Sequence, residues 1–257
     1  MGRVQDKVAI ITGGASGVGR ADAILLAREG AKVILTDVND KDGAAVEKEI
    51  TGAGGTALFV QQDISSEDDW QRVIALAKEK FGGLDILVNN AAILMSGTIE
   101  EASYEDWKKI QRVNADGYFL GCKYAYAAMK ERGGGSIVNM SSISAIGGVS
   151  SFLAYSASKG AVAAMTRSIA AHARFNHHKI RCNAIHPDGI KTPMVYKLPR
   201  DPAKQSQVRE KDPKQLMARF AEAEDIANVV LFLASDESRM IQGAEVRVDN
   251  GYLMWSD

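Results

Sequence analysis

A tyrosine and a lysine stand four residues apart in the sequence, as Tyr155-x-x-x-Lys159. Positions i and i+4 of a helix share one face, so the phenol and the ammonium can point into the same cleft. A free tyrosine has a pKa of about 10 and is a poor base at neutral pH, but a nearby cation favours the tyrosinate. Tyr155 can then take a proton from an alcohol or return one to a carbonyl. Because chance supplies such a pair often, it decides nothing without support from other residues.

Two further polar clusters follow apolar runs that are typical of buried strands. Ser142 comes after the run 136–140, where its hydroxyl can hydrogen-bond a substrate oxygen and hold it toward Tyr155. Asn90 comes after the run 86–88, where a side-chain amide can brace a turn and a cofactor pocket. Ligands of open α/β sheets bind at the carboxyl ends of the strands, so both clusters support the same cleft.

Glycines dominate the segment that follows the first apolar run, with the spacing Gly13-x-x-x-Gly17-x-Gly19. A helix N-terminus presents unpaired N–H groups and a partial positive charge, so pyrophosphate fits there if no side chain obstructs it. The spacing differs from the common G-x-G-x-x-G fingerprint. A glycine-rich turn can also be no more than a turn, but its place between a strand and a helix favours a nucleotide site.

Asp37 ends the second apolar run, 18 residues after Gly19 and close to the offset expected of a ribose-binding carboxylate. A carboxylate there accepts hydrogen bonds from an adenosine ribose and repels a 2′-phosphate. Val38 and Ser16 stand at places where an Arg or Lys would pair with a 2′-phosphate, so the sequence predicts NAD rather than NADP. The alternative is a solvated aspartate that opens the loop 38–40.

The elements that must position these residues alternate along the chain. Apolar strand-like runs separated by helical patterns indicate a parallel sheet covered on both faces, and right-handed crossovers make it doubly wound, as in Rossmann-type folds. We expect about seven strands, at 8–11, 33–37, 57–60, 86–88, 136–140, 180–185 and 245–248. We expect helices at 21–29 (closed by Gly30), 41–51, 67–81, 104–130, 155–175 and 223–234.

One segment breaks this alternation within what we expect to be a single domain, 1–257. All five prolines and many charges fall in residues 187–215, which predicts an insertion with neither a strand nor an uninterrupted helix. Because it follows the carboxyl end of a strand, a lid over the ligand cleft is the favoured interpretation. The alternative is a surface excursion without a role.

Composition excludes several classes of protein. With 46% hydrophobic residues and 25% charged residues, the chain can bury a large core and is not disordered. A formal net charge of −1 gives no support for nucleic-acid binding. The N-terminus has no signal-peptide core, and no apolar run approaches the roughly 18 residues of a membrane helix. Two cysteines make no disulfide framework, so we expect a cytoplasmic protein without membrane or nucleic-acid partners.

Taken together and in order, the motifs resemble those of the short-chain dehydrogenase/reductase family over essentially the whole chain. The matching residues are Thr12-Gly13-x-x-x-Gly17-x-Gly19, Asp63-Ile64, Asn89-Asn90-Ala91-Ala92, Asn114, Ser142, Tyr155-x-x-x-Lys159 and 187–192. The resemblance implies that Tyr155 is the general acid/base and that Ser142 orients the reacting oxygen. It implies that Lys159 lowers the pKa of Tyr155 and holds the nicotinamide ribose, and that Asn114 holds a water linking Lys159 to solvent.

The resemblance also implies an NAD site. Asp63 and Ile64 would meet the adenine, and Ile190 and Thr192 would meet the nicotinamide carboxamide, while the cofactor performs the hydride chemistry. The expected cofactor contacts are Gly13, Ser16, Gly17, Val18, Gly19, Asp37, Asp63, Ile64, Asn90, Tyr155, Lys159, Pro187, Ile190 and Thr192, and no metal is expected.

Two departures from the family pattern bear on the substrate. Ala92 stands where the family usually has glycine, and Asp188 separates Pro187 from Gly189 where Pro-Gly is usual. The latter variant is similar to the bacterial 3β/17β-hydroxysteroid dehydrogenase branch, which implies a hydroxysteroid substrate. A non-steroid alicyclic or other hydrophobic secondary alcohol is the alternative. A rival from another class is a non-catalytic nucleotide-binding regulator, against which the complete catalytic set speaks.

Apolar residues near Ser142 and in the insertion predict a hydrophobic substrate pocket, although each of them can equally pack the core. They are 93–95, Ile143, Ala145, Ile146, Val149, Phe152, Met194, Val195, Tyr196 and Leu198. The apolar tail 252–255 is expected to close a pocket or pack on a neighbouring subunit. The alanine-rich helix 155–175 and the helix holding Asn114 form a tetramer interface in the resembled family, which implies a homotetramer. His172, His177 and His178 are interpreted as surface residues, and Cys122 and Cys182 as small buried hydrophobes.

Overall fold

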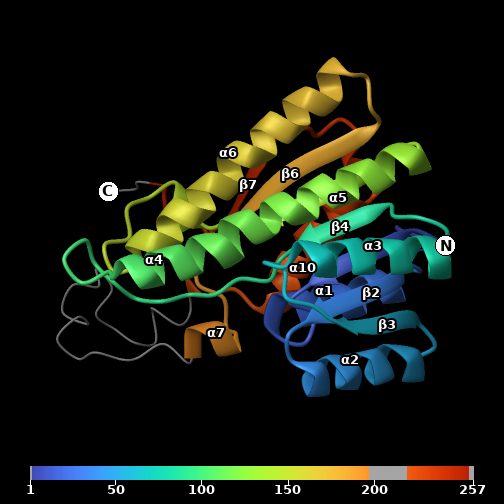
Figure 1. The fold of residues 1–257 in the computed structure, drawn as a ribbon, viewed down its shortest axis with the longest axis horizontal. Coiled ribbons are helices and arrows are strands. Elements are labelled where there is room, and N and C mark those ends of the chain that lie inside the picture. Colours follow the sequence, from blue (N-terminus) through green and yellow to red (C-terminus); the bar gives the residue numbers. More distant parts are fainter. Residues whose placement is uncertain (1, 197–218, 255–257) are drawn as a thin grey trace.

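The computed structural model describes residues 2–196 and 219–254. Seven parallel strands form one sheet in the order β3-β2-β1-β4-β5-β6-β7 (Figure 1), which confirms the predicted doubly wound fold. The strands are β1 (Val8–Thr12), β2 (Lys32–Asp37), β3 (Thr56–Gln61), β4 (Ile86–Asn89), β5 (Gly135–Met140), β6 (Ile180–Pro187) and β7 (Glu245–Val248). The order reverses between β1 and β4, and a crevice for ligands opens at such a reversal.

Helices cover both faces of the sheet (Figure 1). One apolar core lies under α1, α2 and α10, and a second lies under α3, α5 and α6. The helices are α1 (Gly17–Arg28), α2 (Asp40–Gly52), α3 (Glu67–Phe81), α4 (Tyr104–Gln111), α5 (Gly117–Arg132), α6 (Leu153–Phe175), α7 (Pro193–Tyr196) and α10 (Ala223–Ala234). Central strands such as β1 are buried along their whole length, which explains their continuous apolar sequence.

Local capping signals explain why most elements begin and end within two residues of their predicted bounds. The Ser66 side chain accepts a hydrogen bond from the Asp69 N–H at the start of α3, and Gly82 ends that helix in the left-handed conformation. Gly30, with φ +89°, closes α1 as expected. That helix begins at Gly17, four residues before the predicted start, because the glycine-rich turn leads directly into its first turn.

The single helix predicted over 104–130 is wrong in one respect. A π-helical turn, η1 (Arg112–Asp116), separates α4 from α5. Single π-turns are frequent at functional sites, and this one contains the buried Asn114. Its side chain binds the backbone of Ile93, a long-range contact that no local periodicity reveals.

The predicted insertion 187–215 is described only in part. Pro187 is the last residue of β6 and pairs with Val248 of β7, so its placement in the insertion is wrong. The four-residue helix α7 follows, whereas 197–215 lies outside the described residues. The described part of the C-terminal tail packs on its own chain, because the Tyr252 ring stacks 3.7 Å from the Arg219 guanidinium. Trp255 of that tail lies outside the described residues.

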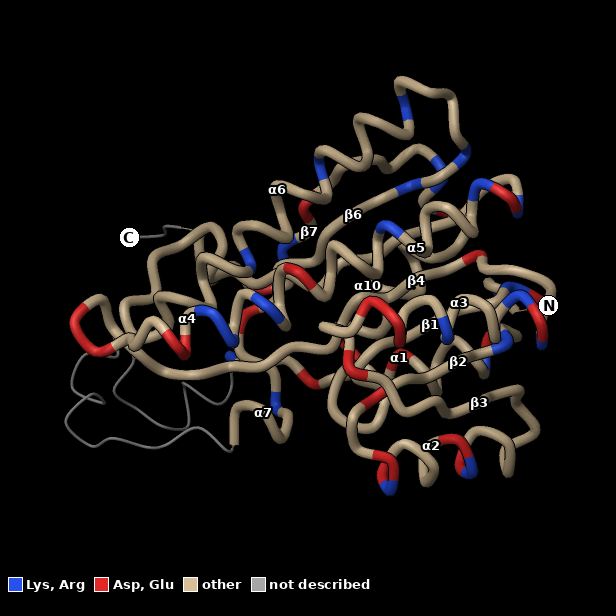
Figure 2. Tube along the Cα trace, viewed as in Figure 1, with Lys and Arg blue, Asp and Glu red and all other residues tan. Residues whose placement is uncertain are grey.

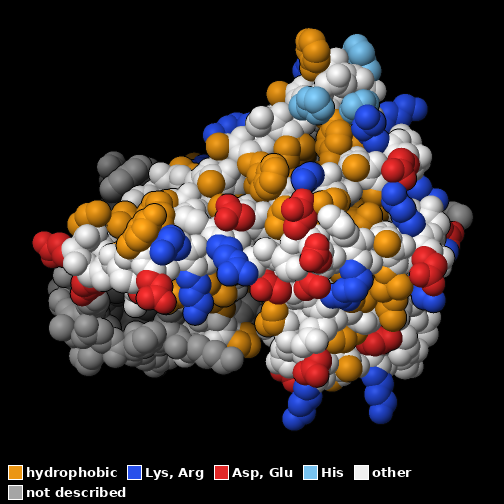
Figure 3. Space-filling view, viewed as in Figure 1, with side chains coloured by type: hydrophobic (Ala, Val, Ile, Leu, Met, Phe, Trp, Pro, Cys, Tyr) orange, Lys and Arg blue, Asp and Glu red, His pale blue; other side chains and the backbone are white. Residues whose placement is uncertain are grey.

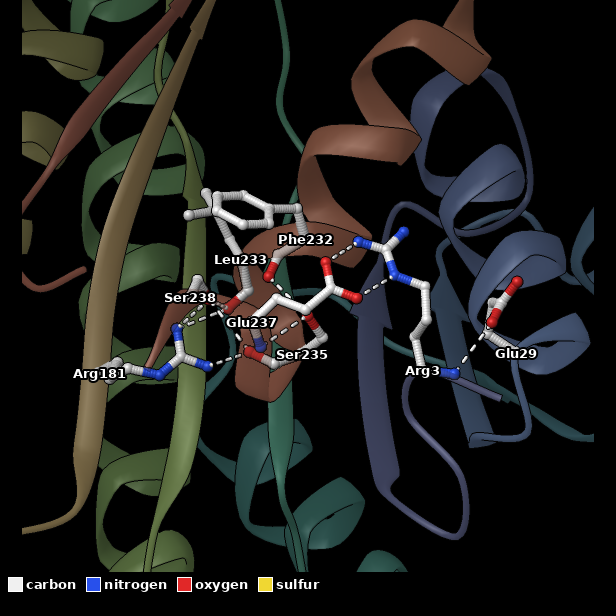
Figure 4. A network of polar contacts seen from close by, with 8 residues as sticks. All are labelled: Arg3, Glu29, Arg181, Phe232, Leu233, Ser235, Glu237 and Ser238. Carbon is white, nitrogen blue, oxygen red and sulfur yellow. Dashed lines mark hydrogen bonds and ion pairs between the residues drawn. The ribbon is translucent and has the colours of Figure 1, made fainter. Parts of the chain in front are cut away.

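A polar network fastens the end of α10 to the N-terminus and to β6 (Figure 4). The Arg181 guanidinium donates hydrogen bonds to the carbonyls of Leu233 and Ser235 and to the Ser238 hydroxyl, at 2.7–3.0 Å. Arg3 donates two hydrogen bonds to the Glu237 carboxylate. Buried carbonyls at the end of the helix therefore gain charged donors.

Figure 2 shows both acidic and basic residues distributed over the fold, in keeping with the small net charge. Over the described ranges, none of the helices is long and apolar enough to cross a membrane.

Candidate active site

The glycine-rich turn between β1 and α1 has no room for side chains. A Cβ atom on Gly13 would lie 2.9 Å from the Cα of Ala91, and one on Gly19 would overlap the Gly13 carbonyl oxygen. Gly13 and Gly17 also have φ of +69° and +54°, a region that glycine adopts without strain. The first N–H groups of α1 have no partner within the helix. The turn is therefore a backbone cradle for a phosphate group.

Asp37, at the carboxyl end of β2, is held beside this cradle. Its Oδ2 accepts a hydrogen bond from the Ala15 N–H at 3.2 Å, and its Oδ1 accepts one from the Asn39 N–H at 3.0 Å. Its neighbours in the cavity wall, Thr36 and Val38, carry no charge. The carboxylate is thus fixed next to the cradle and is not neutralised by either neighbour.

One cavity of about 440 Å³ joins the cradle to Tyr155 along the carboxyl edge of the sheet. Every predicted cofactor contact except Gly19 lines it. Gly19 lies against the Asn90 amide, which a Cβ on this glycine would approach to 2.6 Å. A cradle that a Cβ would fill, continuous with a carboxylate and a Tyr–Lys pair, fits a dinucleotide that reaches from one end to the other.

Thr12 braces the turn from below, a role that the sequence analysis did not assign to it. Its Oγ1 accepts hydrogen bonds from the N–H groups of Asn90 and Ala91, at 2.9 and 3.0 Å. The Asn90 amide in turn donates to the Thr12 carbonyl at 3.0 Å. The ends of β1 and β4 are therefore tied together, and Asn90 does brace this turn.

Ser142 and Tyr155 meet at the other end of the cavity. Ser142 caps the short helix η2 (Ile143–Ala145), and its hydroxyl accepts a hydrogen bond from the Ser144 N–H at 3.1 Å. Tyr155 lies in the first turn of α6, and its hydroxyl is close enough to the Ser142 side chain for a hydrogen bond. Both residues line the cavity, so an oxygen atom of a ligand can contact the two hydroxyls together.

Lys159 lies under Tyr155 and is only 1% exposed. Its Nζ donates hydrogen bonds to the Met140 carbonyl at 2.7 Å and to the Tyr118 hydroxyl at 3.1 Å, and lies 5.7 Å from the centre of the Tyr155 ring. The buried Tyr118 was not predicted as a site residue. The only signal for Tyr118 in the sequence is its position four residues after Asn114. That spacing predicts a shared helix face only for a regular α-helix, and the π-turn changes which residues share a face.

Burial dominates the proton affinities of this pair. It raises the pKa of Tyr155 to about 12, against a smaller lowering by the Ser142 hydroxyl. It also lowers the pKa of Lys159 to about 7. The expectation that Lys159 makes Tyr155 acidic is therefore wrong for the chain alone, because the buried ammonium is itself only partly protonated at neutral pH.

Asn114 connects two walls of the site without lining the cavity. Its Oδ1 accepts from the Ile93 N–H and its Nδ2 donates to the Ile93 carbonyl, both at 2.9 Å. The Nδ2 also donates to the Ser158 hydroxyl at 3.2 Å, one residue before Lys159. Asn114 thus holds the segment after β4 against α6, while its predicted water relay stays a prediction.

The expected apolar substrate wall is reproduced only in part. Ile93 and Met194 line the cavity. Ile143 packs inside the protein, whereas the Ile146 side chain is 52% exposed. Leu198 lies outside the described residues.

The histidine cluster lies away from this cavity. Figure 3 shows pale blue histidine side chains gathered where α6 ends. The Tyr126 hydroxyl and the His178 Nδ1 lie 2.7 Å apart, and the His172 ring packs on both. Within the described ranges, no three His, Cys, Asp or Glu side chains are grouped to hold a metal ion. Cys122 and Cys182 are buried free thiols, as predicted.

Comparisons with known proteins agree with this geometry. Residues 13–253 match the family described as Enoyl-(Acyl carrier protein) reductase. A 3-beta-hydroxysteroid dehydrogenase of Comamonas testosteroni is 45% identical over 253 residues, which cover 98% of this chain and 97% of the relative. An NADP-dependent (R)-specific alcohol dehydrogenase of Lentilactobacillus kefiri is 42% identical, over 97% of this chain and 98% of the relative. The crystal structure of levodione reductase superimposes with a TM-score of 0.85 and 33% identity, covering 96% of this chain and 97% of that chain.

Proposed function

The chain belongs to the short-chain dehydrogenase/reductase family, and on this premise we propose that it is an NAD-dependent oxidoreductase that interconverts a secondary alcohol and a ketone. The observation that carries the proposal is the single cavity that joins the glycine cradle to Ser142, Tyr155 and Lys159. When bound, the nicotinamide dinucleotide would supply the hydride acceptor or donor for the carbinol carbon.

The chain's own residues manage the oxygen and its proton. The Tyr155 phenolate takes the proton of the alcohol in oxidation, and the Tyr155 phenol returns it to the carbonyl oxygen in reduction. The Ser142 hydroxyl hydrogen-bonds the same oxygen and orients it. Lys159, in its protonated form, places a positive charge beneath Tyr155, and its ammonium would hold the nicotinamide ribose. A water at Asn114 would link Lys159 to solvent as a proton relay.

NAD is the proposed cofactor because of Asp37. Its carboxylate stands beside the cradle between uncharged neighbours, where a 2′-phosphate would meet a like charge. Family membership does not decide the matter, since the relative from Lentilactobacillus kefiri is NADP-dependent.

A hydroxysteroid of the 3β/17β type is the proposed substrate class. The 45% identity to the 3-beta-hydroxysteroid dehydrogenase supports it, as does the apolar wall formed by Ile93 and Met194 near the catalytic hydroxyls. A panel of steroid and non-steroid alicyclic alcohols, assayed with NAD, separates this class from the alicyclic alternative.

We also propose a cytoplasmic homotetramer. The Phe119 side chain on α5 is 54% exposed, and α6 exposes Ala161, Ala164 and Ala171, so these helices present small and apolar surface. Light scattering on the purified protein is expected to give four times the chain mass, and a monomer would contradict this part of the proposal.

Replacement of Tyr155 by Phe tests the reaction. The phenylalanine keeps the ring but cannot move a proton, so turnover followed by the absorbance of the reduced cofactor should fall by at least about a hundredfold. NAD affinity, measured by calorimetry, should be retained. A non-catalytic regulator predicts no turnover in the wild type and no effect of Tyr155→Phe on its biological activity, and that result would overturn the proposal.

A further inference from the structure

A buried histidine contacts the main chain of the proposed catalytic serine. His186, in β6, is fully buried, and its Nδ1 lies 2.8 Å from the carbonyl oxygen of Ser142. On the other side of the ring, Nε2 lies 3.1 Å from Oε2 of Glu245 in β7, but without the alignment of a hydrogen bond. The other carboxylate oxygen of Glu245 is paired with Arg167 of α6. A chain of polar contacts thus runs from Arg167 to Ser142.

The contact at Nδ1 defines the state of the ring. A neutral imidazole has one N–H, and a carbonyl oxygen can only accept, so the proton must be on Nδ1. Burial lowers the pKa of His186, and the nearby Arg167 and Lys159 lower it further, against the opposite effects of Ser142 and Glu245. The neutral ring with Nδ1–H therefore prevails at neutral pH, in agreement with the unpaired Nε2.

Ser142 needs such a support because the sheet stops beside it. The last backbone hydrogen bond along β5 and β6 at this point runs from the Ser141 N–H to the Ile185 carbonyl, at 2.8 Å. Beyond it, the Ser142 carbonyl accepts only from Ala145 within the short helix η2, at 3.1 Å, and from His186, as far as the described residues show. Of these two hydrogen bonds, only the one from His186 connects Ser142 to a strand of the sheet.

We propose that His186 is a positioning residue for the reaction: its Nδ1–H fixes the Ser142 carbonyl, so that the Ser142 hydroxyl stays aligned with Tyr155. The proposal rests on the proposed function, since it assigns Ser142 to the reacting oxygen. Small displacements of a catalytic group cost much of the rate, whereas cofactor binding at the distant cradle does not depend on this contact.

Two substitutions of His186 separate the effect of its hydrogen bond from the effect of its side-chain volume. His186→Leu keeps an apolar volume but has no donor, and kcat with a secondary alcohol should fall about ten- to a hundredfold with NAD affinity unchanged. His186→Asn places an amide N–H near the position of Nδ1 and should recover kcat to within a few-fold of the wild type. Unchanged kcat in His186→Leu, or an equal loss in His186→Asn, would overturn the proposal.

A third variant keeps the test decisive if His186→Leu does not fold. His186→Gln keeps a polar side chain of similar size, but its amide reaches the position of Nε2 rather than that of Nδ1, so kcat should fall several-fold with KM and NAD affinity unchanged. His186→Asn is its matched control, because only the position of the amide differs. Equal kcat in His186→Gln and His186→Asn would overturn the proposal.

The same assay distinguishes failure of this inference from failure of the proposed function. Ser142→Ala and Tyr155→Phe should both abolish most turnover. If they retain it, the proposed function itself is wrong. If they lose it while the His186 variants behave as the wild type, only the positioning role is wrong.

Discussion

Lys159 has a cost in stability that its position in the site explains. Its ammonium is buried beside Tyr155 and Tyr118, and burial lowers its pKa from 10.5 to about 7. A group that loses its proton so readily in the folded state opposes folding wherever the unfolded chain keeps that proton. The position therefore opposes folding, in keeping with the chemical role proposed for Lys159.

We predict a characteristic pH dependence of this cost. Between about pH 7 and pH 10.5 the unfolded chain binds one proton more than the folded chain at Lys159, so the free energy of unfolding rises with pH across this window. Lys159→Met has no such proton, so this contribution to the rise should be absent. Across the window the free energy of unfolding of the wild type should therefore rise by a few kcal/mol more than that of Lys159→Met. Denaturant titrations of the ligand-free proteins at several pH values measure it, and parallel curves would contradict the assignment.

In the proposed function, Asp37 sets the preference for NAD over NADP at the other end of the cavity. Asp37→Ala removes the charge beside the cradle, so kcat/KM with NAD should fall relative to that with NADP by about tenfold or more. Asp40→Ala, in the same loop region but outside the cavity wall, is the control and should keep the wild-type ratio. An unchanged ratio in Asp37→Ala would remove this residue from the site.

The residues that the sequence revealed are those whose function depends on type and spacing. Tyr155-x-x-x-Lys159, Ser142 and the glycines were predicted because their motif is local. Tyr118 and His186 were missed because their roles come from contacts across elements, and an isolated tyrosine in a helix or histidine in a strand carries no pattern.

At the scale of single elements, the turn before α1 has a backbone shape that the proposed cofactor site requires. A Cβ on Gly19 would overlap the Gly13 carbonyl, whereas a Cβ on Gly52 in α2 would meet open space, with no neighbouring atom within 4 Å. Gly19→Val should therefore weaken NAD binding at least about tenfold, since the cradle must open. Gly52→Ala, the matched control, should leave binding unchanged in calorimetry, and equal affinity for the two variants would contradict the cradle.

Element boundaries were predictable where capping residues mark them and not where tertiary contacts decide. Ser66 and Gly82 bound α3 as their chemistry requires. The π-turn at Asn114 has no such signal, because the amide is fixed by Ile93, a residue 21 positions earlier. The prediction of the apolar substrate wall was only partly right for a similar reason. Tertiary packing decides which hydrophobic residues after Ser142 lie in the core and which lie at the surface.

At the scale of the whole molecule, the parallel sheet brings distant segments to one edge. The glycine turn, Asn90, Ser142 and Pro187 lie at the carboxyl ends of four strands that are neighbours in the sheet, β1, β4, β5 and β6. Alternation of strands and helices is sufficient to predict this convergence, because every strand of a parallel sheet ends at the same edge.

Stability of the whole fold depends on how α10 is tied back to the sheet. Arg181→Met removes three hydrogen bonds from a charged, partly buried donor to the end of that helix. The free energy of unfolding should fall by about 2–4 kcal/mol, since the buried carbonyls of Leu233 and Ser235 lose their charged donor and keep only neutral ones, such as the Ser238 hydroxyl. Arg3→Met, at the exposed ion pair with Glu237, should cost clearly less in the same denaturant titration. Equal losses of unfolding free energy in Arg181→Met and Arg3→Met would show that the hydrogen bonds of Arg181 drawn in Figure 4 are not what holds the helix.

Direct transfer of hydrogen from the carbinol carbon to nicotinamide is the most specific consequence of this account. The wild-type protein is incubated with NAD and a secondary alcohol that carries deuterium on the carbinol carbon, and the reduced cofactor is analysed by mass spectrometry. One deuterium should appear in the reduced cofactor, and Tyr155→Phe should form almost none of this product. Reduced cofactor without deuterium, or no reduction by the wild type with any alcohol of the panel, would contradict the account.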